Sequence, residues 1–394
     1  MIDRTRSRRW PLSAVAISLL AFQLGACTST GSHDQVVAQS SHYQGGVEAP
    51  RTEPERHMPR PVAATIPDSW SAIAQPARKT QPGTLETPDP LRVHFLNVGS
   101  GSCQIVECPD SADILIADCG AARPGVSDMS RGEIAAFLDS IGFDGEVIVT
   151  VSHPHEEHYN RIVPLMGQRK ARSIWLGGEF LSYGGEGPDE IGRWLDAQAA
   201  SGVSIFQGFP AGYANRGAPV SGLQCGSAEV FILTVNSGTG PNDNSMMLMV
   251  RHGDFRVIFP GDAGGISEDT AVENFGALLN EVSVLAATNH GAAGTGGNQR
   301  SWARATSPQS VVFNTGLAGG NPEKTAGSQY LNYVLPNANR HVMWWSPKAS
   351  GTTATFETTQ AIYATGLNGR IVVESDGSQF SLQCVRNGAA EDCF

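Results

Sequence analysis

The chain lacks several patterns that identify common classes of enzyme. No Gly-x-Ser-x-Gly motif occurs in its 394 residues, so a serine hydrolase with a nucleophile elbow is not favoured. The glycine-rich segment 291–297 has no lysine followed by serine or threonine, which excludes a phosphate-binding loop there. None of the seven cysteines is spaced Cys-x-x-Cys, so disulfides are favoured over zinc binding by cysteine.

Positive charge and long apolar runs are also scarce. The chain has 27 Lys and Arg against 38 Asp and Glu, a formal net charge of −11. Proteins that grip a polyanion non-specifically need clustered Lys and Arg, so this balance disfavours nucleic acid as a partner. The one long apolar stretch, from Leu12 to Leu24, is too short to span a bilayer stably.

That stretch is typical of an export signal. Four arginines precede it, at positions 4, 6, 8 and 9. It ends in Leu24-Gly25-Ala26-Cys27, which resembles the lipobox of bacterial lipoproteins, where the chain is cut before a cysteine that is then lipidated. By the same resemblance, Thr28 after the cysteine favours the outer membrane. We expect residues 1–27 to be a lipoprotein signal, with lipidated Cys27 anchoring the protein at the periplasmic or surface face.

Composition divides the rest of the chain. Residues 28–90 are rich in Ser, Thr, Gln and Pro and have no apolar period, which predicts a flexible tether. Residues 91–380 are long enough for one large α/β domain or two small ones, and we expect one domain there. In the C-terminal tail, 381–394, Cys384 and Cys393 flank a short polar loop and are the first expected disulfide pair. The partners of the other cysteines stay open.

The local patterns of the domain alternate between sheet and helix. Ser130 and Glu133 form a capping-box pattern that predicts a helix over 130–140, ended by Gly142, and a second helix is predicted over 189–200. Strands are predicted at 93–98, 102–108, 114–117, 147–151, 173–176, 203–206, 230–235, 245–251, 255–259, 285–287 and 311–314. This alternation predicts a layered α/β protein with its ligands on loops at one edge.

A dense group of ligand-type side chains follows the predicted strand 147–151. Residues 152–158 read Ser-His-Pro-His-Glu-Glu-His, in a chain with only 10 histidines. A strand end followed by a tight turn can bring His153, His155 and His158 to one point, and imidazole and carboxylate hold zinc, manganese or iron. A polar loop with three unrelated histidines is the structural alternative. The spacing predicts a metal site with hydrolytic chemistry.

Further polar clusters stand where other predicted strands end. In order, Asp118, the histidine cluster, Gly261-Asp262 and His290 resemble the metallo-β-lactamase superfamily, and more narrowly the hydrolase domain of ComEC-type competence proteins. The motifs that carry the narrower resemblance are Phe95-Leu96-Asn97-Val98-Gly99-Ser100-Gly101, Ser152-His153-Pro154, Asp243-Asn244-Ser245, Gly261-Asp262-Ala263, His290-Gly291 and Thr365-Gly366-Leu367-Asn368-Gly369-Arg370-Ile371. The resemblance covers about residues 91–380.

The resemblance implies an αβ/βα sandwich of two mixed sheets flanked by helices. It also implies a metal-dependent hydrolase with two divalent ions, zinc or manganese, that cleaves a phosphoester by a metal-bound hydroxide. His153 and His155 would hold the first metal, and His158 and His290 the second together with Glu157. Asp262 would bridge both metals, and Glu157 and Asp262 would be the catalytic residues. Asp118 and Asn244 would contact the ligands.

Two departures from the family pattern leave alternatives open. Glu157 stands where the family has aspartate, and no histidine between His158 and His252 supplies the usual third ligand of the first metal. One residue of 242–244 could fill that gap, although forming a turn is the other reading of these residues. A weakened or one-metal enzyme and a non-catalytic envelope binding protein are therefore alternatives. A DNA nuclease related to competence proteins is a third, disfavoured by the acidic charge.

Overall fold

The computed structural model describes residues 89–122, 128–183, 190–294, 296–316, 320–334, 336–345, 354–386 and 389–393. The expected signal, Cys27 and nearly all of the expected tether lie outside these ranges. Within them, no helix has both the length and the hydropathy needed to cross a membrane.

Among the described residues, the larger of two main sheets has nine strands. Their order is β17-β16-β15-β1-β2-β3-β4-β5-β6, antiparallel from β17 to β3 and parallel from β3 to β6. The strands are β1 (Leu91–Phe95), β2 (Cys103–Glu107), β3 (Ile114–Cys119), β4 (Val147–Val151), β5 (Ala171–Leu176), β6 (Ser204–Phe206), β15 (Arg370–Ser375), β16 (Phe380–Arg386) and β17 (Ala389–Asp392). The residues expected as a C-terminal tail thus supply two strands at one edge of this sheet.

The second sheet has six strands in the order β14-β11-β10-β9-β8-β7. Strands β14, β11, β10 and β9 are parallel, whereas β8 is antiparallel to both of its neighbours. The strands are β7 (Glu229–Thr234), β8 (Met247–His252), β9 (Phe255–Phe259), β10 (Val284–Ala286), β11 (Ser310–Phe313) and β14 (Ile362–Ala364); β12 (Pro336–Trp345) and β13 (Ala354–Gln360) form a separate hairpin.

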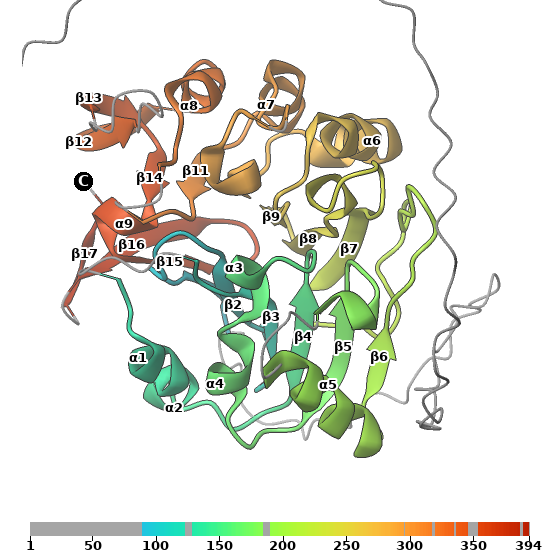
Figure 1. Cartoon of the computed structure of the whole chain (residues 1–394). Helices are drawn as coiled ribbons and strands as arrows, with labels where there is room; N and C mark the ends of the chain where they lie inside the picture. The colour runs from blue at the N-terminus through green and yellow to red at the C-terminus, as the bar shows by residue number, and fades with distance from the viewer. Residues whose placement is uncertain are drawn as a thin grey trace, which may run out of the picture. The chain divides into compact units, whose positions relative to one another are not determined.

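Helices flank the two sheets. In Figure 1, α1, α2, α4 and α5 lie along the side of the larger sheet, and α6, α7 and α8 lie along the opposite side. The described α-helices are α1 (Arg131–Ala135), α2 (Phe137–Ser140), α3 (Glu156–Tyr159), α4 (Ile162–Met166), α5 (Glu190–Ala200), α6 (Gly265–Phe275), α7 (Arg300–Thr306), α8 (Lys324–Leu331) and α9 (Thr365–Asn368). The fold is the expected α/β sandwich of two mixed sheets flanked by helices.

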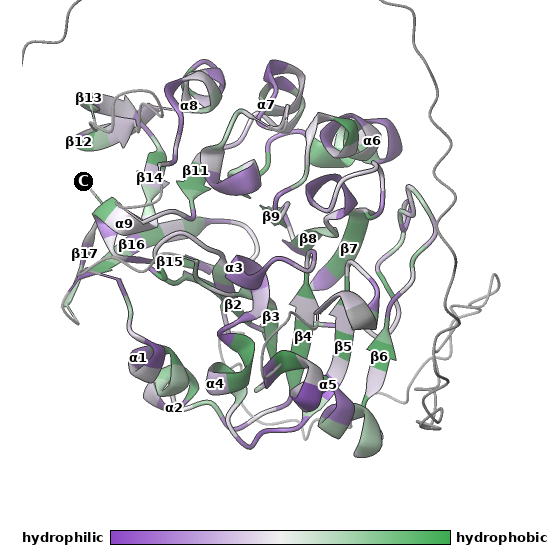
Figure 2. Ribbon diagram, viewed as in Figure 1, coloured by the Kyte–Doolittle hydropathy of each residue, from purple (hydrophilic) through white to green (hydrophobic). Residues whose placement is uncertain are grey.

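Alternating side chains of the larger sheet serve two apolar cores. On β4, Val147, Val149 and Val151 pack with residues of the flanking helices, whereas Ile148 packs with residues of the second sheet. Because successive side chains of a strand point to opposite faces, one apolar strand can contribute to the cores on both faces of the sheet. Figure 2 shows the strands mostly in the hydrophobic colour and the helices with mixed colours, as this layering requires.

The capping box expected at the start of the first helix is present. The Ser130 hydroxyl accepts the N–H of Glu133, and the Glu133 carboxylate accepts the N–H of Ser130. The single helix expected over 130–140 is divided into α1 and α2 at Ala136. Helix α6, which no sequence pattern predicted, has mostly small and polar residues and therefore little helical period.

The described part of the chain contains three disulfides. Cys384 is bonded to Cys393, the pair expected from the short loop between them. Cys103 is bonded to Cys119 across the β2–β3 pair, and Cys108 to Cys225 over a separation of 117 residues. The last bond joins the end of β2 to the segment before β7, and so connects the two sheets.

Candidate metal centre

The expected site residues converge at one edge of the sandwich, where parallel strands of both sheets end. Asp118 lies near the end of β3, and the histidine cluster follows β4. From the second sheet, Asp262 follows β9 and His290 follows β10. Carboxyl ends of parallel strands in a sheet share one edge, so the two sheets bring these loops face to face.

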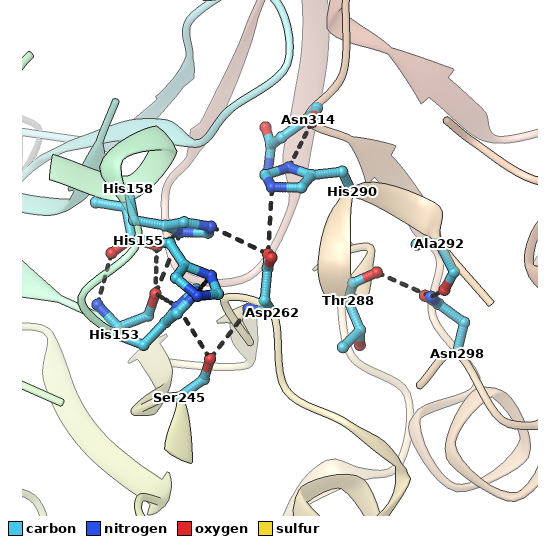
Figure 3. A network of polar contacts seen from close by, with 12 residues as sticks. His153, His155, His158, Ser245, Asp262, Thr288, His290, Ala292, Asn298 and Asn314 are labelled. Carbon is cyan, nitrogen blue, oxygen red and sulfur yellow. Dashed lines mark hydrogen bonds and ion pairs between the residues drawn. The ribbon is translucent and has the colours of Figure 1, made fainter. Parts of the chain in front are cut away.

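A glycine allows the two sets of loops to approach. Gly261 has a positive φ of 59°, and a Cβ atom at this position would lie 2.5 Å from the Cβ of Ser152. The N–H of Asn289 also donates to the carbonyl of Gly261, at 2.9 Å. Asp262 is therefore held directly between the histidine cluster and the His290 loop, as Figure 3 shows.

The ring orientation of His158 is set by Asp118. Nδ1 of His158 lies 2.8 Å from a carboxylate oxygen of Asp118, and both side chains are buried. The same carboxylate accepts the N–H and the hydroxyl of Ser152, at 2.6 and 2.8 Å. Because a carboxylate accepts, Nδ1 carries the proton and the neutral ring has its free lone pair on Nε2.

His290 has the same tautomer for a different reason. Its Nδ1 lies 2.9 Å from the backbone carbonyl of Asn314, the residue after β11. A carbonyl can only accept, so Nδ1 must donate and Nε2 is left with a lone pair. Histidines that ligate metals nearly always donate their other ring N–H to a carboxylate or carbonyl in this way.

Three buried acceptor atoms meet at the centre of the site. Oδ1 of Asp262 lies 3.1 Å from Nε2 of His158 and 3.2 Å from Nε2 of His290, and none of the three atoms makes a hydrogen bond. A carboxylate oxygen and two lone-pair nitrogens repel one another unless a cation, either a proton or a metal ion, lies among them. We refer to His158, Asp262 and His290 as the second group.

A first group shares the same carboxylate. Ligand atoms of His153, His155 and Asp262 lie within 4.8 Å of one another, and so do those of the second group. Nε2 of His153 lies 2.8 Å from Nδ1 of His155, and the His155 ring is partly exposed. Two histidines and one carboxylate with a position left open make a donor set typical of catalytic zinc sites.

The electrostatics of the centre favour an ionised Asp262. Burial opposes its ionisation, but the charges of His290 and His158 outweigh burial and hold the pKa of Asp262 well below its ordinary value. Burial likewise opposes a charge on His158, yet the carboxylates of Asp262 and Asp118 raise its pKa well above the ordinary value. At His153 burial dominates and lowers the pKa, so this ring is neutral. A divalent cation would replace the proton as the partner of Asp262.

The structure brings together most, but not all, of the expected ligands. Five of the six lie in the two groups, and Asp118 contacts His158, which belongs to the second group. Glu157 is in neither group. It precedes His158 on the short helix α3, where neighbouring residues point in different directions, and its backbone carbonyl accepts the N–H of Ser102. Its role as a ligand and catalytic residue stays a prediction.

The segment proposed to replace the missing histidine forms a turn. Residues 242–244 make a 3₁₀ turn before β8, and the Asn244 side-chain oxygen is buried without a hydrogen-bond partner. The expected contact of Asn244 with the ligands therefore stays a prediction. His252 lies at the far end of β8 from this turn and belongs to neither group. The side chain of Asn160 bonds to the backbone of Ala121.

Two buried serines support His153, and sequence reasoning assigned them no role. The hydroxyls of Ser152 and Ser245 lie 3.1 and 3.2 Å from Nδ1 of His153, and Ser245 also accepts the N–H of Asp262 at 3.2 Å. Both serines belong to motifs that carried the resemblance, so the signal was present in the sequence. Their contacts turn Nε2 of His153 toward the first group.

Comparisons with known proteins add no family assignment. No protein-family model matches the chain, and no curated protein matches it. Among solved structures, a mutant of the CmlA β-hydroxylase matches with a TM-score of 0.36 and 14% identity over 59% of this chain. Tm1679, described as a metal-dependent hydrolase of the β-lactamase superfamily, matches with a TM-score of 0.37 and 14% identity over 62% of this chain. A metallo-β-lactamase from Hirschia baltica matches with a TM-score of 0.27 and 10% identity over 47% of this chain.

The matches differ in how much of the other protein they cover. The matched regions cover 47% of the CmlA chain, 93% of Tm1679 and 80% of the Hirschia protein. This protein therefore spans about half the length of CmlA. Because every score is below 0.5, neither the fold nor the activity of this chain is inferred from them.

Proposed function

We propose that this protein is a metal-dependent hydrolase with two divalent ions, zinc or manganese, that cleaves a phosphoester. The proposal rests on the three converging acceptor atoms of the second group, Nε2 of His158, Nε2 of His290 and Oδ1 of Asp262. A buried arrangement of this kind is unfavourable for a chain that binds no cation at the centre.

The chain's own residues prepare both groups. Asp118 and the carbonyl of Asn314 hold protons at Nδ1 of His158 and His290, which leaves Nε2 of each ring free. Asp262 places one carboxylate between the groups. Divalent ions held there would bring the pKa of water toward neutrality and stabilise negative charge that develops on the substrate.

The substrate class is proposed from the resemblance to the hydrolase domain of ComEC-type competence proteins. A net charge of −11 offers no general attraction for DNA, so we propose a small phosphoester rather than a polynucleotide. The lipoprotein signal supports action in the bacterial envelope, with the chain anchored through Cys27.

Metal content tests the proposal directly. The full chain is purified, equilibrated with zinc or manganese, and analysed by mass spectrometry, with hydrolysis of bis(p-nitrophenyl) phosphate assayed in parallel. We expect about two ions per chain for the wild type, in keeping with a two-metal site, and about one for His290→Ala, because this change removes a ligand of the second group alone. We expect the hydrolysis rate to fall at least about 100-fold with it.

Two further variants sharpen the result. His252→Ala removes a histidine at the far end of β8 and should keep both ions and full activity. Glu157→Gln tests the ligand role predicted for Glu157, whose carboxylate is in neither group: loss of one ion would support that role, and retention of both ions would exclude it. Failure of the wild type to take up either metal would refute the proposal. Metal uptake without hydrolysis of phosphodiesters, phosphomonoesters or DNA would instead support the non-catalytic binding protein.

A further inference from the structure

The loop that carries His290 is held in an unfavourable backbone conformation. Asn289 and His290 have φ values of 48° and 53°, both in the left-handed region that non-glycine residues seldom adopt. Two such residues in succession persist only where surrounding contacts impose them. The position of the His290 ring therefore depends on whatever fixes this loop.

One side chain bridges the two ends of the loop. Nδ2 of Asn298 donates to the carbonyl of Thr288 and to the carbonyl of Ala292, both at 2.8 Å. These carbonyls lie two residues before and two residues after His290, as Figure 3 shows. Asn298 is 2% exposed, so both bonds are shielded from competing water.

Asn298 is itself fixed from two sides. The hydroxyl of Tyr330, on α8, donates to its side-chain oxygen at 2.8 Å, which sets the orientation of the amide group. The side-chain carboxyl group of Glu268, on α6, accepts the backbone N–H of Asn298 at 2.6 Å and the hydroxyl of Thr288 at 2.9 Å. Glu268, Asn298 and Tyr330 all have buried side chains.

We infer that Asn298, oriented by Glu268 and Tyr330, is a positioning residue for the His290 ligand. The inference rests on the proposed metal centre and adds to it a set of residues that contact no metal. Asn298 holds both ends of the loop, so Nε2 of His290 stays directed at Asp262. Loss of the amide would let the left-handed pair relax and would withdraw the ring from the second group alone.

The test compares Asn298→Ala with a matched loss of a buried amide elsewhere. In the full chain, zinc and manganese binding is measured at buffered free-metal concentrations. We expect Asn298→Ala to weaken one of the two metal-binding steps about 10- to 100-fold, the loss typical when a group that holds a metal ligand in place is removed. The affinity of the other step should stay within about twofold of the wild type. Tyr330→Phe, which keeps the amide but frees its orientation, should weaken the same step by less.

Gln198→Ala is the control. Gln198, on α5, is also a buried amide that bonds at both ends to backbone, since it accepts the N–H of Ala171 and donates to the carbonyl of Arg169. Gln198→Ala should lower the melting temperature and change neither binding step. Equal weakening of both steps in Asn298→Ala, or unchanged binding, would overturn the inference.

A readout without metal separates this inference from the proposed function. The N–H of Asn289 bonds to the carbonyl of Gly261, and that of Ala292 bonds to the carbonyl of Asn289, so hydrogen exchange at these amides can be measured with no metal added. We expect hydrogen exchange of these two amides to become faster in Asn298→Ala and to stay slow in Gln198→Ala. If the wild type binds no metal, the proposed function fails, and exchange at these amides still decides whether Asn298 holds the loop.

Discussion

At the scale of single residues, the position of the proton on His158 and His290 follows from two neighbouring groups that can only accept hydrogen bonds. A carboxylate of Asp118 and a backbone carbonyl of Asn314 contact Nδ1 of His158 and His290, and both can only accept. The side chain of Asn314 is not required for this, because its backbone makes the contact. One main-chain group and one side-chain group thus leave Nε2 of each ring without a proton.

Glu268 is a buried carboxyl outside the metal groups, and it makes stability depend on pH. Burial raises its pKa to about 8, although hydrogen bonds from Gln299, Asn298 and Thr288 oppose the shift; the ordinary value is 4.5. Between these values the folded chain keeps a proton that the unfolded chain has lost. The free energy of unfolding therefore falls as the pH rises from about 5 to 8. Above the folded pKa, this carboxyl no longer makes the free energy of unfolding change with pH.

We expect Glu268→Gln to remove this dependence, because an amide does not ionise. The free energy of urea unfolding, measured at pH 5, 6, 7 and 8, should fall more steeply for the wild type, by up to about 1.4 kcal/mol per pH unit. Glu273→Gln, on the exposed face of the same helix, should follow the wild type. Parallel curves for Glu268→Gln and the wild type would show that Glu268 is ionised throughout.

At the scale of elements, the short helix α3 owes its place to Gly120. This residue follows β3, and a Cβ atom there would lie 2.4 to 2.6 Å from the backbone of Glu156, Glu157 and His158. Helix α3 therefore rests directly on the chain after β3. This contact includes His158 itself and lies two residues after Asp118, so it keeps these two side chains close to one another.

Gly120→Ala should push α3 away and disturb both metal groups. We expect the free energy of unfolding to fall by about 1–3 kcal/mol, the usual cost of overpacking, and metal uptake to fall with it. Gly132→Ala is the matched control: it is exposed on α1, with no atom nearer than 3.9 Å to the added carbon. That change should raise stability by about 0.5–1 kcal/mol, because alanine favours helix. An undisturbed metal content in Gly120→Ala would contradict the role given to this contact.

At the scale of the whole molecule, one disulfide connects the two sheets that build the centre. Cys108 follows β2 of the larger sheet, and Cys225 precedes β7 of the second sheet. Cross-linking stabilises mainly by restricting the unfolded chain, and the restriction grows with the length of the closed loop. The separation is 117 residues here, against 9 between Cys384 and Cys393.

Removal of each disulfide by a double Cys→Ala change should show this difference. The chain-entropy relation gives a loss of about 5 kcal/mol for Cys108 and Cys225 together, and about 2.5 kcal/mol for Cys384 and Cys393. Unfolding in urea under oxidising conditions measures both losses. Equal losses for the two pairs would mean that strain or residual structure, rather than loop length, sets their contribution.

Local sequence pattern was sufficient for much of this protein. The capping box of Ser130 and Glu133, the apolar run at 147–151 and the clustered histidines each depend on neighbours a few residues away. Period and capping are properties of one segment, so they can be interpreted before the chain is folded. The layered α/β architecture follows from the alternation of such segments.

Long-range packing was needed for the rest. The disulfide partners of Cys103, Cys108 and Cys119 come together only in the folded chain. The same is true of the bonds from Asn298 to the His290 loop and of the position of Glu157 outside the first and second groups. Asn and His adopt the left-handed region more often than most residues, but this weak preference does not predict that Asn289 and His290 both adopt it in succession. Gly261 and Asn314 contact these two residues directly, and Asn298 bonds to both ends of their loop, so distant parts of the chain supply the contacts that offset the backbone cost.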